Sequence, residues 1–159
     1  MSEEEKIQQE LLQHFAFLEG KMRIQRQRRI FVDLAQEDFL RVFEYAVRQL
    51  QFSVLSALTG LDEGVTLGFM YHIANEAGIV LNLKINVSRE NPVLKTITDY
   101  FASAEIYERE LVDLLGVKVE GLKEGKRYPL SDDWPAGQYP LRKDWKKEML
   151  KDKEKTKNA

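Results

Sequence analysis

The chain of 159 residues contains no cysteine. This absence excludes disulfides, thiolate nucleophiles and the usual ligands of iron–sulfur clusters and structural zinc. Histidine is almost as scarce, with only His14 and His72, so a histidine-rich metal site is not expected either. The sequence therefore predicts no metal and no cofactor bound by this chain itself.

Long apolar runs and an excess of one charge are missing as well. No stretch approaches the ~20 apolar residues that a membrane-spanning helix needs. The acidic start, Ser-Glu-Glu-Glu after Met1, does not resemble a secretory signal. A formal net charge of −2 provides no basic field for nucleic acid or anionic lipid. We expect a cytoplasmic protein that binds no nucleic acid and meets a membrane only through partner proteins.

The spacing of apolar residues predicts three helices. Residues 4–19 and 37–50 carry apolar side chains three and four positions apart, which is typical of amphipathic helices. A third helix is predicted from Ser103 to Leu115, with Gly116 as its C-terminal stop. Residues 28–34 are rich in branched and aromatic side chains and favour a strand.

From residue 52 to residue 87 the apolar period shortens to two in three segments, which is typical of strands. The breaks at 62–64 and 75–78 are short and contain glycine, so we expect hairpins and antiparallel pairing. These patterns predict an α+β fold: a mostly antiparallel sheet of about four strands packed by helices, with an extended C-terminal arm. The expected domains are a compact body at 1–121, a partner-binding arm at 122–145 and a charged, flexible tail at 146–159.

Two charged motifs stand out against this background. In the third predicted helix Glu105, Arg109 and Asp113 stand four residues apart, so Arg109 can pair with a carboxylate on either side. Such a ladder is either an ordinary solvated helix face or a docking surface. The second motif follows Pro140, whose ring stiffens the chain before Arg142 and favours reaching a carboxylate on a partner.

Tryptophans flank the second motif. Trp134 and Trp145 are large side chains that are costly to leave in water, so they are covered either by this chain or by a partner. Other charged groups have equally open interpretations. Arg23, Arg26 and their neighbours form a basic cluster that is either a solvated edge or a contact for an acidic surface.

The ordered motif series resembles a known family. The series reads Glu108-Arg109-Glu110, Asp113, Gly116, Glu120-Gly121, Asp132-Asp133-Trp134 and Pro140-Leu141-Arg142-Lys143-Asp144. In this order it is similar to the C-type, 30-kDa subunit shared by respiratory complex I and the membrane-bound, energy-converting nickel–iron hydrogenases. The family usually has a His-Pro pair where this chain has Leu122-Lys123, and a histidine where it has Tyr139. These departures favour the hydrogenase-type branch over complex I.

The resemblance implies a cofactor-free, peripheral subunit of an ion-translocating oxidoreductase. Its implied partners are the large, nickel–iron hydrogenase-like subunit and the small iron–sulfur subunit, which hold the iron–sulfur clusters and the nickel–iron centre or quinone. It assigns no catalytic residue to this chain. The motif residues are implied to contact the partner: Glu108, Arg109, Glu110, Asp113, Trp134, Tyr139, Pro140, Leu141, Arg142, Lys143 and Asp144.

Two other classes of function stay open at this point. A stand-alone soluble enzyme needs a pocket between the sheet and the third helix, built from Glu108, Arg109, Asp113 and His72. The sequence lacks a glycine-rich phosphate-binding loop, a serine nucleophile elbow and a helix with a His-Glu zinc-binding motif. These absences disfavour independent catalysis. A generic adaptor without a redox connection is the other alternative.

Overall fold

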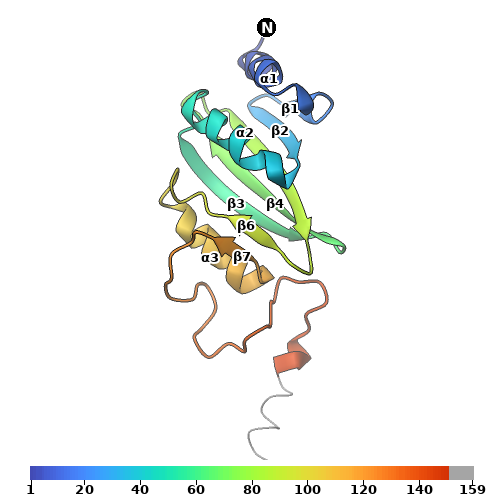
Figure 1. Cartoon of the computed structure of the whole chain (residues 1–159), viewed down its shortest axis with the longest axis vertical. Coiled ribbons are helices and arrows are strands. Elements are labelled where there is room, and N and C mark those ends of the chain that lie inside the picture. The colour runs from blue at the N-terminus through green and yellow to red at the C-terminus, as the bar shows by residue number, and fades with distance from the viewer. Residues whose placement is uncertain (151–159) are drawn as a thin grey trace, which may run out of the picture.

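The computed structural model describes residues 1–150, and Figure 1 shows an elongated molecule with the N-terminus at one end and the arm at the other. A five-stranded sheet in the order β1-β2-β5-β4-β3 forms its centre. Its strands are β1 (Met22–Arg26), β2 (Arg29–Leu34), β3 (Val54–Asp62), β4 (Thr66–Ala74) and β5 (Val80–Ser88). The helices are α1 (Glu3–His14), η1 (Ala16–Leu18), α2 (Gln36–Arg48), α3 (Ala104–Leu115) and η2 (Lys147–Leu150), and a separate parallel pair comprises β6 (Val93–Lys95) and β7 (Lys118–Glu120).

This arrangement confirms the predicted α+β class and the antiparallel hairpins. Strand β3 pairs antiparallel with β4, and β4 with β5. At the first turn the Asp62 carboxylate accepts a hydrogen bond from the Gly64 amide, and Gly64 adopts a φ of 92° that favours glycine. The sheet contains one strand more than predicted, β1, and β2 pairs with β5 in parallel.

One face of the sheet is covered by helices, as Figure 1 shows for α2. The apolar side of α2 is buried through Phe39, Val42, Phe43 and Ala46. Phe39 packs against Tyr71 of β4, with ring centroids 4.3 Å apart. Because neighbouring residues of a strand point to opposite faces, Tyr71 lies in this core while the adjacent residues of β4 lie on the other face.

Helix α3 packs on the same face, against β3. Gly60 of β3 makes this close approach possible, because a methyl group there would overlap the side chains of Leu111 and Leu115. The helix ends where predicted, at Gly116, which adopts the left-handed conformation with φ of 71°. The C-terminal end of α3 is therefore fixed against the sheet.

The arm follows β7 and has no helix or strand until η2. The sequence predicted it as an extended, partner-binding segment at 122–145. It runs along the outer side of α3, and the Leu141 amide donates to the carbonyl of Leu114 at 3.0 Å. The flexible tail predicted from residue 146 begins as η2, and its last part, residues 151–159, lies outside the described residues.

Candidate functional site

The first predicted contact residue, Glu108, points into the protein. Its exposed fraction is 1%, and its carboxylate accepts hydrogen bonds from the Ile97 amide and the Thr96 hydroxyl, both at 2.7 Å. Burial raises the pKa of Glu108, and these two hydrogen bonds oppose that effect only in part. Glu108 thus fixes the turn before α3, and its side chain is not presented to a partner in this structure.

The predicted ladder on α3 forms on one side only. Arg109 pairs with Glu105 at 2.8 Å, as the four-residue spacing allows, and also donates to the carbonyl of Lys123 at 2.8 Å. Asp113 forms its ion pair with Arg127 at 3.3 Å rather than with Arg109, and it is only 8% exposed. Lys123 and Arg127 belong to the arm, so both charged residues of α3 hold the arm in place.

The second motif closes onto the end of α3. The guanidinium of Arg142 donates through Nε to the carbonyl of Leu115 at 2.7 Å and stacks over the ring of Tyr139, 5.1 Å from its centroid. The last carbonyls of a helix have no partner within the helix and attract cations, so Arg142 satisfies one of them. Tyr139 itself packs against Gly116. The stiff arm predicted from Pro140 is therefore anchored by its own motif.

A buried carboxylate completes the anchor. The backbone amide of Lys143 donates to Oδ2 of Asp62 at 2.7 Å, across 81 positions of sequence. Asp62 also pairs with Arg89, which in turn pairs with Asp144 at 2.7 Å. Burial by itself raises the pKa of Asp62, but hydrogen bonds from Arg89, Lys143 and Gly64 outweigh it and lower the pKa to about 2. Asp62 stays ionised and bridges the β3–β4 hairpin to the arm.

Sequence reasoning missed both members of this buried ion pair. Asp62 was recognised only as part of a turn, and Arg89 was not singled out at all. Their side chains are 2% and 19% exposed. An Asp before Glu-Gly is typical of a hairpin, and no local pattern indicates that it also accepts a hydrogen bond from the arm. The contact depends on the path of the arm, which the sequence does not specify.

The tryptophans cover each other. The rings of Trp134 and Trp145 lie 5.8 Å apart, and their indole N–H groups donate to the carbonyl and the side-chain oxygen of Gln138. The sequence left open whether the tryptophans are covered by this chain or by a partner. The chain itself covers part of each side chain, and both remain half-buried. The pair stiffens the loop that precedes η2.

The arm and η2 expose apolar side chains as well as charged ones. Tyr128, Leu141 and Met149 are 48%, 52% and 45% exposed, and all three lie on the arm or on η2. The side chains of Lys143 and Asp144 are exposed beside Leu141, whereas Glu110 and Pro140 are half-buried. Large apolar side chains fixed on an ordered loop with charged neighbours are typical of a protein–protein contact.

The four residues of the hypothetical enzyme site do not converge. His72 lies on the sheet face away from α3, where its ring bonds to Asn82 at 2.6 Å and Thr59 at 3.0 Å. Glu108, Arg109 and Asp113 have the separate partners described above. A hollow of about 330 Å³ between α2 and β6 is lined by other residues. Within residues 1–150, no three His, Asp or Glu side chains are grouped to hold a metal, and no helix is long and apolar enough to cross a membrane.

Comparison with known proteins gives a consistent family. Residues 32–150 match the family described as respiratory-chain NADH dehydrogenase, 30 Kd subunit. The chain is 31% identical to the membrane-bound hydrogenase subunit beta of Pyrococcus furiosus, over 77% of this chain and 75% of that one. It is 34% identical to the C subunit of the F(420)H(2) dehydrogenase of Methanosarcina mazei, over 82% and 80%. It is also 34% identical to the C subunit of the NADH-quinone oxidoreductase of Moorella thermoacetica, over 60% and 65%.

Among solved structures, the fold is similar to a chain of the membrane-bound sulfane sulfur reductase, described as an archaeal respiratory membrane complex. The TM-score is 0.79 at 24% sequence identity, with 97% of this chain and 92% of that chain covered. At this identity the likeness concerns the fold. The high coverage shows that the arm, as well as the sheet and helices, has a counterpart there.

Proposed function

The chain belongs to the family of the 30-kDa subunit of respiratory-chain NADH dehydrogenase, and from that membership we propose that it is a peripheral subunit of a membrane-bound, ion-translocating oxidoreductase of the energy-converting nickel–iron hydrogenase type. In this role it docks onto the large catalytic subunit, next to the small iron–sulfur subunit, and supports assembly and electron transfer. It binds no cofactor: the iron–sulfur clusters and the nickel–iron centre or quinone belong to the partners. Its contact with the membrane is through the complex.

The observation that carries this proposal is an arm held to the body by contacts within the chain itself. Asp62, Arg109, Asp113 and Arg142 all bond the arm to the body. A surface that is already ordered loses less conformational entropy on association than a flexible one. The internal contacts of the motif therefore support docking indirectly, by holding the arm in one shape.

The contact itself is assigned to side chains that the anchors leave free. Leu141 is the central one, because it projects from the anchored segment between Pro140 and Arg142 and is half exposed. Buried apolar anchors ringed by polar groups contribute most of the binding energy at protein interfaces. Tyr128 and Met149 extend this apolar surface, and Lys143 and Asp144 provide its charged rim.

A second candidate function is the C subunit of NADH-quinone oxidoreductase, favoured by the similarity to the Moorella protein. The two candidates differ in the metal content of the partner. The hydrogenase assignment is supported by Leu122-Lys123 and Tyr139 in place of the histidine-containing motifs, and by the similarity to the Pyrococcus hydrogenase protein. Nickel in the purified complex favours the hydrogenase, and its absence together with quinone reduction favours the second candidate.

Purification of the tagged chain from membranes of its source organism tests the docking role. We expect the wild-type chain to bring down a large subunit and an iron–sulfur subunit. Leu141→Ser should lose most of both, because a large side chain is removed from the centre of the contact. Val54→Ser is the matched control, since Val54 is 53% exposed but lies at the start of β3, away from the arm.

The result distinguishes docking from its alternatives. If both variants retain the large subunit, the arm is not the contact surface. A wild-type chain that is recovered alone contradicts the docking role altogether and directs attention to the hollow between α2 and β6.

A further inference from the structure

A groove runs between α3 and the arm. Its larger part, about 560 Å³, lies between the end of α3 and the segment 136–139 of the arm. Its smaller part, about 200 Å³, lies further along the helix beside Arg109. Val112 and Leu122 line both parts and give the groove an apolar floor, so the two hollows adjoin along the helix.

The lining of this groove is basic, in contrast to the chain as a whole. Five basic side chains line it, and the formal net charge of the chain is −2. Among the described residues, the only acidic one in the lining is Asp113, which is already paired with Arg127, and Arg109 is paired with Glu105. The basic lining residues are Arg109, Lys118, Lys123, Lys126 and Arg127.

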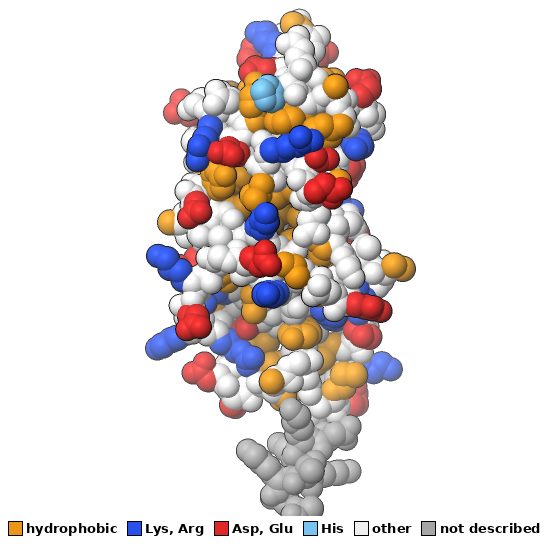
Figure 2. All heavy atoms as spheres, viewed as in Figure 1, with side chains coloured by type: hydrophobic (Ala, Val, Ile, Leu, Met, Phe, Trp, Pro, Cys, Tyr) orange, Lys and Arg blue, Asp and Glu red, His pale blue; other side chains and the backbone are white. Residues whose placement is uncertain are grey.

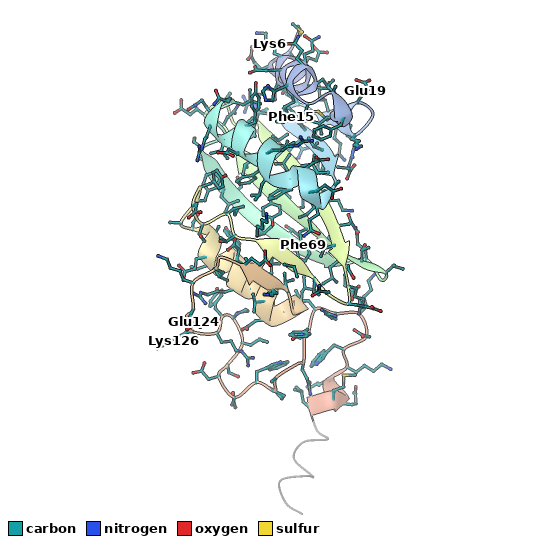
Figure 3. The ribbon with its side chains drawn as sticks, viewed as in Figure 1. Lys6, Phe15, Glu19, Phe69, Glu124 and Lys126 are labelled. Carbon is teal, nitrogen blue, oxygen red and sulfur yellow. The ribbon has the colours of Figure 1, made fainter. Side chains whose placement is uncertain are left out.

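Three of these side chains are unengaged. Lys118, Lys123 and Lys126 are exposed and form no ion pair within residues 1–150. Figure 3 shows Lys126 and its neighbour Glu124 at the outer edge of the molecule, on the loop of the arm beside α3. On the face shown in Figure 2, acidic and basic side chains are interspersed. The lining of the groove thus carries three lysines without an ion pair among residues 1–150, while the neighbouring Glu120 and Glu124 are not part of that lining.

The distribution of these charges indicates an extended ligand. The lysines are spread along both parts of the groove, and the bridge between Arg127 and Asp113 lies between them, so they do not converge on one point as donors around a small anion do. The apolar floor requires an apolar side chain as well. The chain's own last nine residues carry four lysines against two acidic residues, so their charge does not complement the groove.

We propose that the groove receives an extended, acidic segment of the large partner subunit. Its carboxylates lie on Lys118, Lys123 and Lys126, and at least one of its apolar side chains rests on Val112 and Leu122. This inference rests on the proposed docking function and adds to it a second contact, distinct from Leu141. The exposed lysines chiefly accelerate and orient association, as complementary charges at an interface do.

A photo-crosslinking amino acid at position 123 in the assembled complex tests this inference, with the same label at position 26 of β1, at the far edge of the sheet, as control. We expect position 123 to form an adduct with the large subunit, and the adduct peptide to contain more acidic than basic residues. An adduct with a neutral or basic segment, or with the chain's own tail, overturns the proposal. So does the absence of an adduct when the large subunit is present in the purified complex. Failure of the large subunit to co-purify contradicts the docking function itself.

Charge reversal gives an independent readout. Lys123→Glu combined with Lys126→Glu should weaken binding of the full chain to the large subunit about tenfold at low salt, because two exposed attractions become repulsions. The effect should shrink as salt is added. Lys21→Glu combined with Arg26→Glu changes the net charge equally, at the β1 edge of the sheet and away from the groove, and should have little effect. Equal effects of the two pairs overturn the proposal in favour of overall charge.

Discussion

Substitution of Asp62 should loosen the arm before it unfolds the body. Asp62→Asn removes the negative charge, so the ion pair with Arg89 is lost, and the single remaining oxygen accepts a hydrogen bond from Lys143 or from Arg89 but not from both. A hydrogen bond to a charged group contributes about 1.5–3 kcal/mol, and breaking a buried ion pair costs about 3–5 kcal/mol. Arg89 keeps Asp144 as a partner, so we expect a loss of about 3 kcal/mol.

The chain contains its own reporter for this effect. Both of its tryptophans, Trp134 and Trp145, lie on the arm, so tryptophan fluorescence follows the arm while far-ultraviolet circular dichroism follows the body. In a urea titration, Asp62→Asn should shift the fluorescence transition to lower urea more than the dichroism transition. Asp144→Asn is the control, because the Asp144 side chain is 76% exposed and its ion pair is worth at most about 1 kcal/mol.

The effect also has a defined pH dependence. The pKa of Asp62 is lowered from 3.8 to about 2 in the folded chain, so its contribution to stability is complete above about pH 5. As pH falls through the unfolded and then the folded pKa, the contribution is lost. The difference between wild type and Asp62→Asn should therefore be constant from about pH 8 to about pH 5 and disappear toward about pH 2. A loss below about 1 kcal/mol at neutral pH, or an equal loss in Asp144→Asn, refutes the anchoring role.

Substitutions at three further positions test the packing around α3, two of them by urea denaturation and the third by proteolysis. Glu108→Gln should change stability by less than about 1 kcal/mol, since it keeps an acceptor for the Ile97 amide, whereas Glu108→Ala should cost about 2 kcal/mol by leaving that buried donor unpaired. Gly116→Ala should cost about 3 kcal/mol, because its φ of 71° disfavours alanine and the added methyl group overlaps Tyr139. Arg142→Lys should speed proteolysis of the arm while leaving the dichroism spectrum unchanged, because lysine has no planar guanidinium to stack on Tyr139.

The parts of the fold that the sequence predicted are those determined by local pattern. The hairpins followed from glycine-containing breaks between segments of period two, and α2 followed from its spacing of three and four. Strand β1 was missed because it is an edge strand with Arg23 and Arg26 among its five residues, and it reads as a basic cluster. The parallel pairing of β2 with β5, where Ile30 lies opposite Leu81, depends on contacts that no local pattern encodes.

The difference between local patterns and long-range contacts also explains which features of the candidate site were predicted. The motif on α3 and the motif after Pro140 were found, because charge spacing and proline are local signals. Their roles were not, since Glu108 and Arg142 turn toward the body and bond to Ile97 and Leu115. A spacing of four residues indicates which side chains share a helix face, but it does not indicate whether the protein's own arm covers that face. Partner contact at the exposed residues stays a prediction.

Hydroxyl-radical footprinting of the free chain and of the purified complex tests the central claim most directly. Tyr128, Leu141 and Met149 are exposed in the free chain and belong to chemically reactive residue types. If the arm docks onto the large subunit, all three should lose most of their reactivity in the complex, while Val54 at the start of β3 keeps its own. Equal reactivity of the three residues in the free chain and in the complex would contradict docking through the arm.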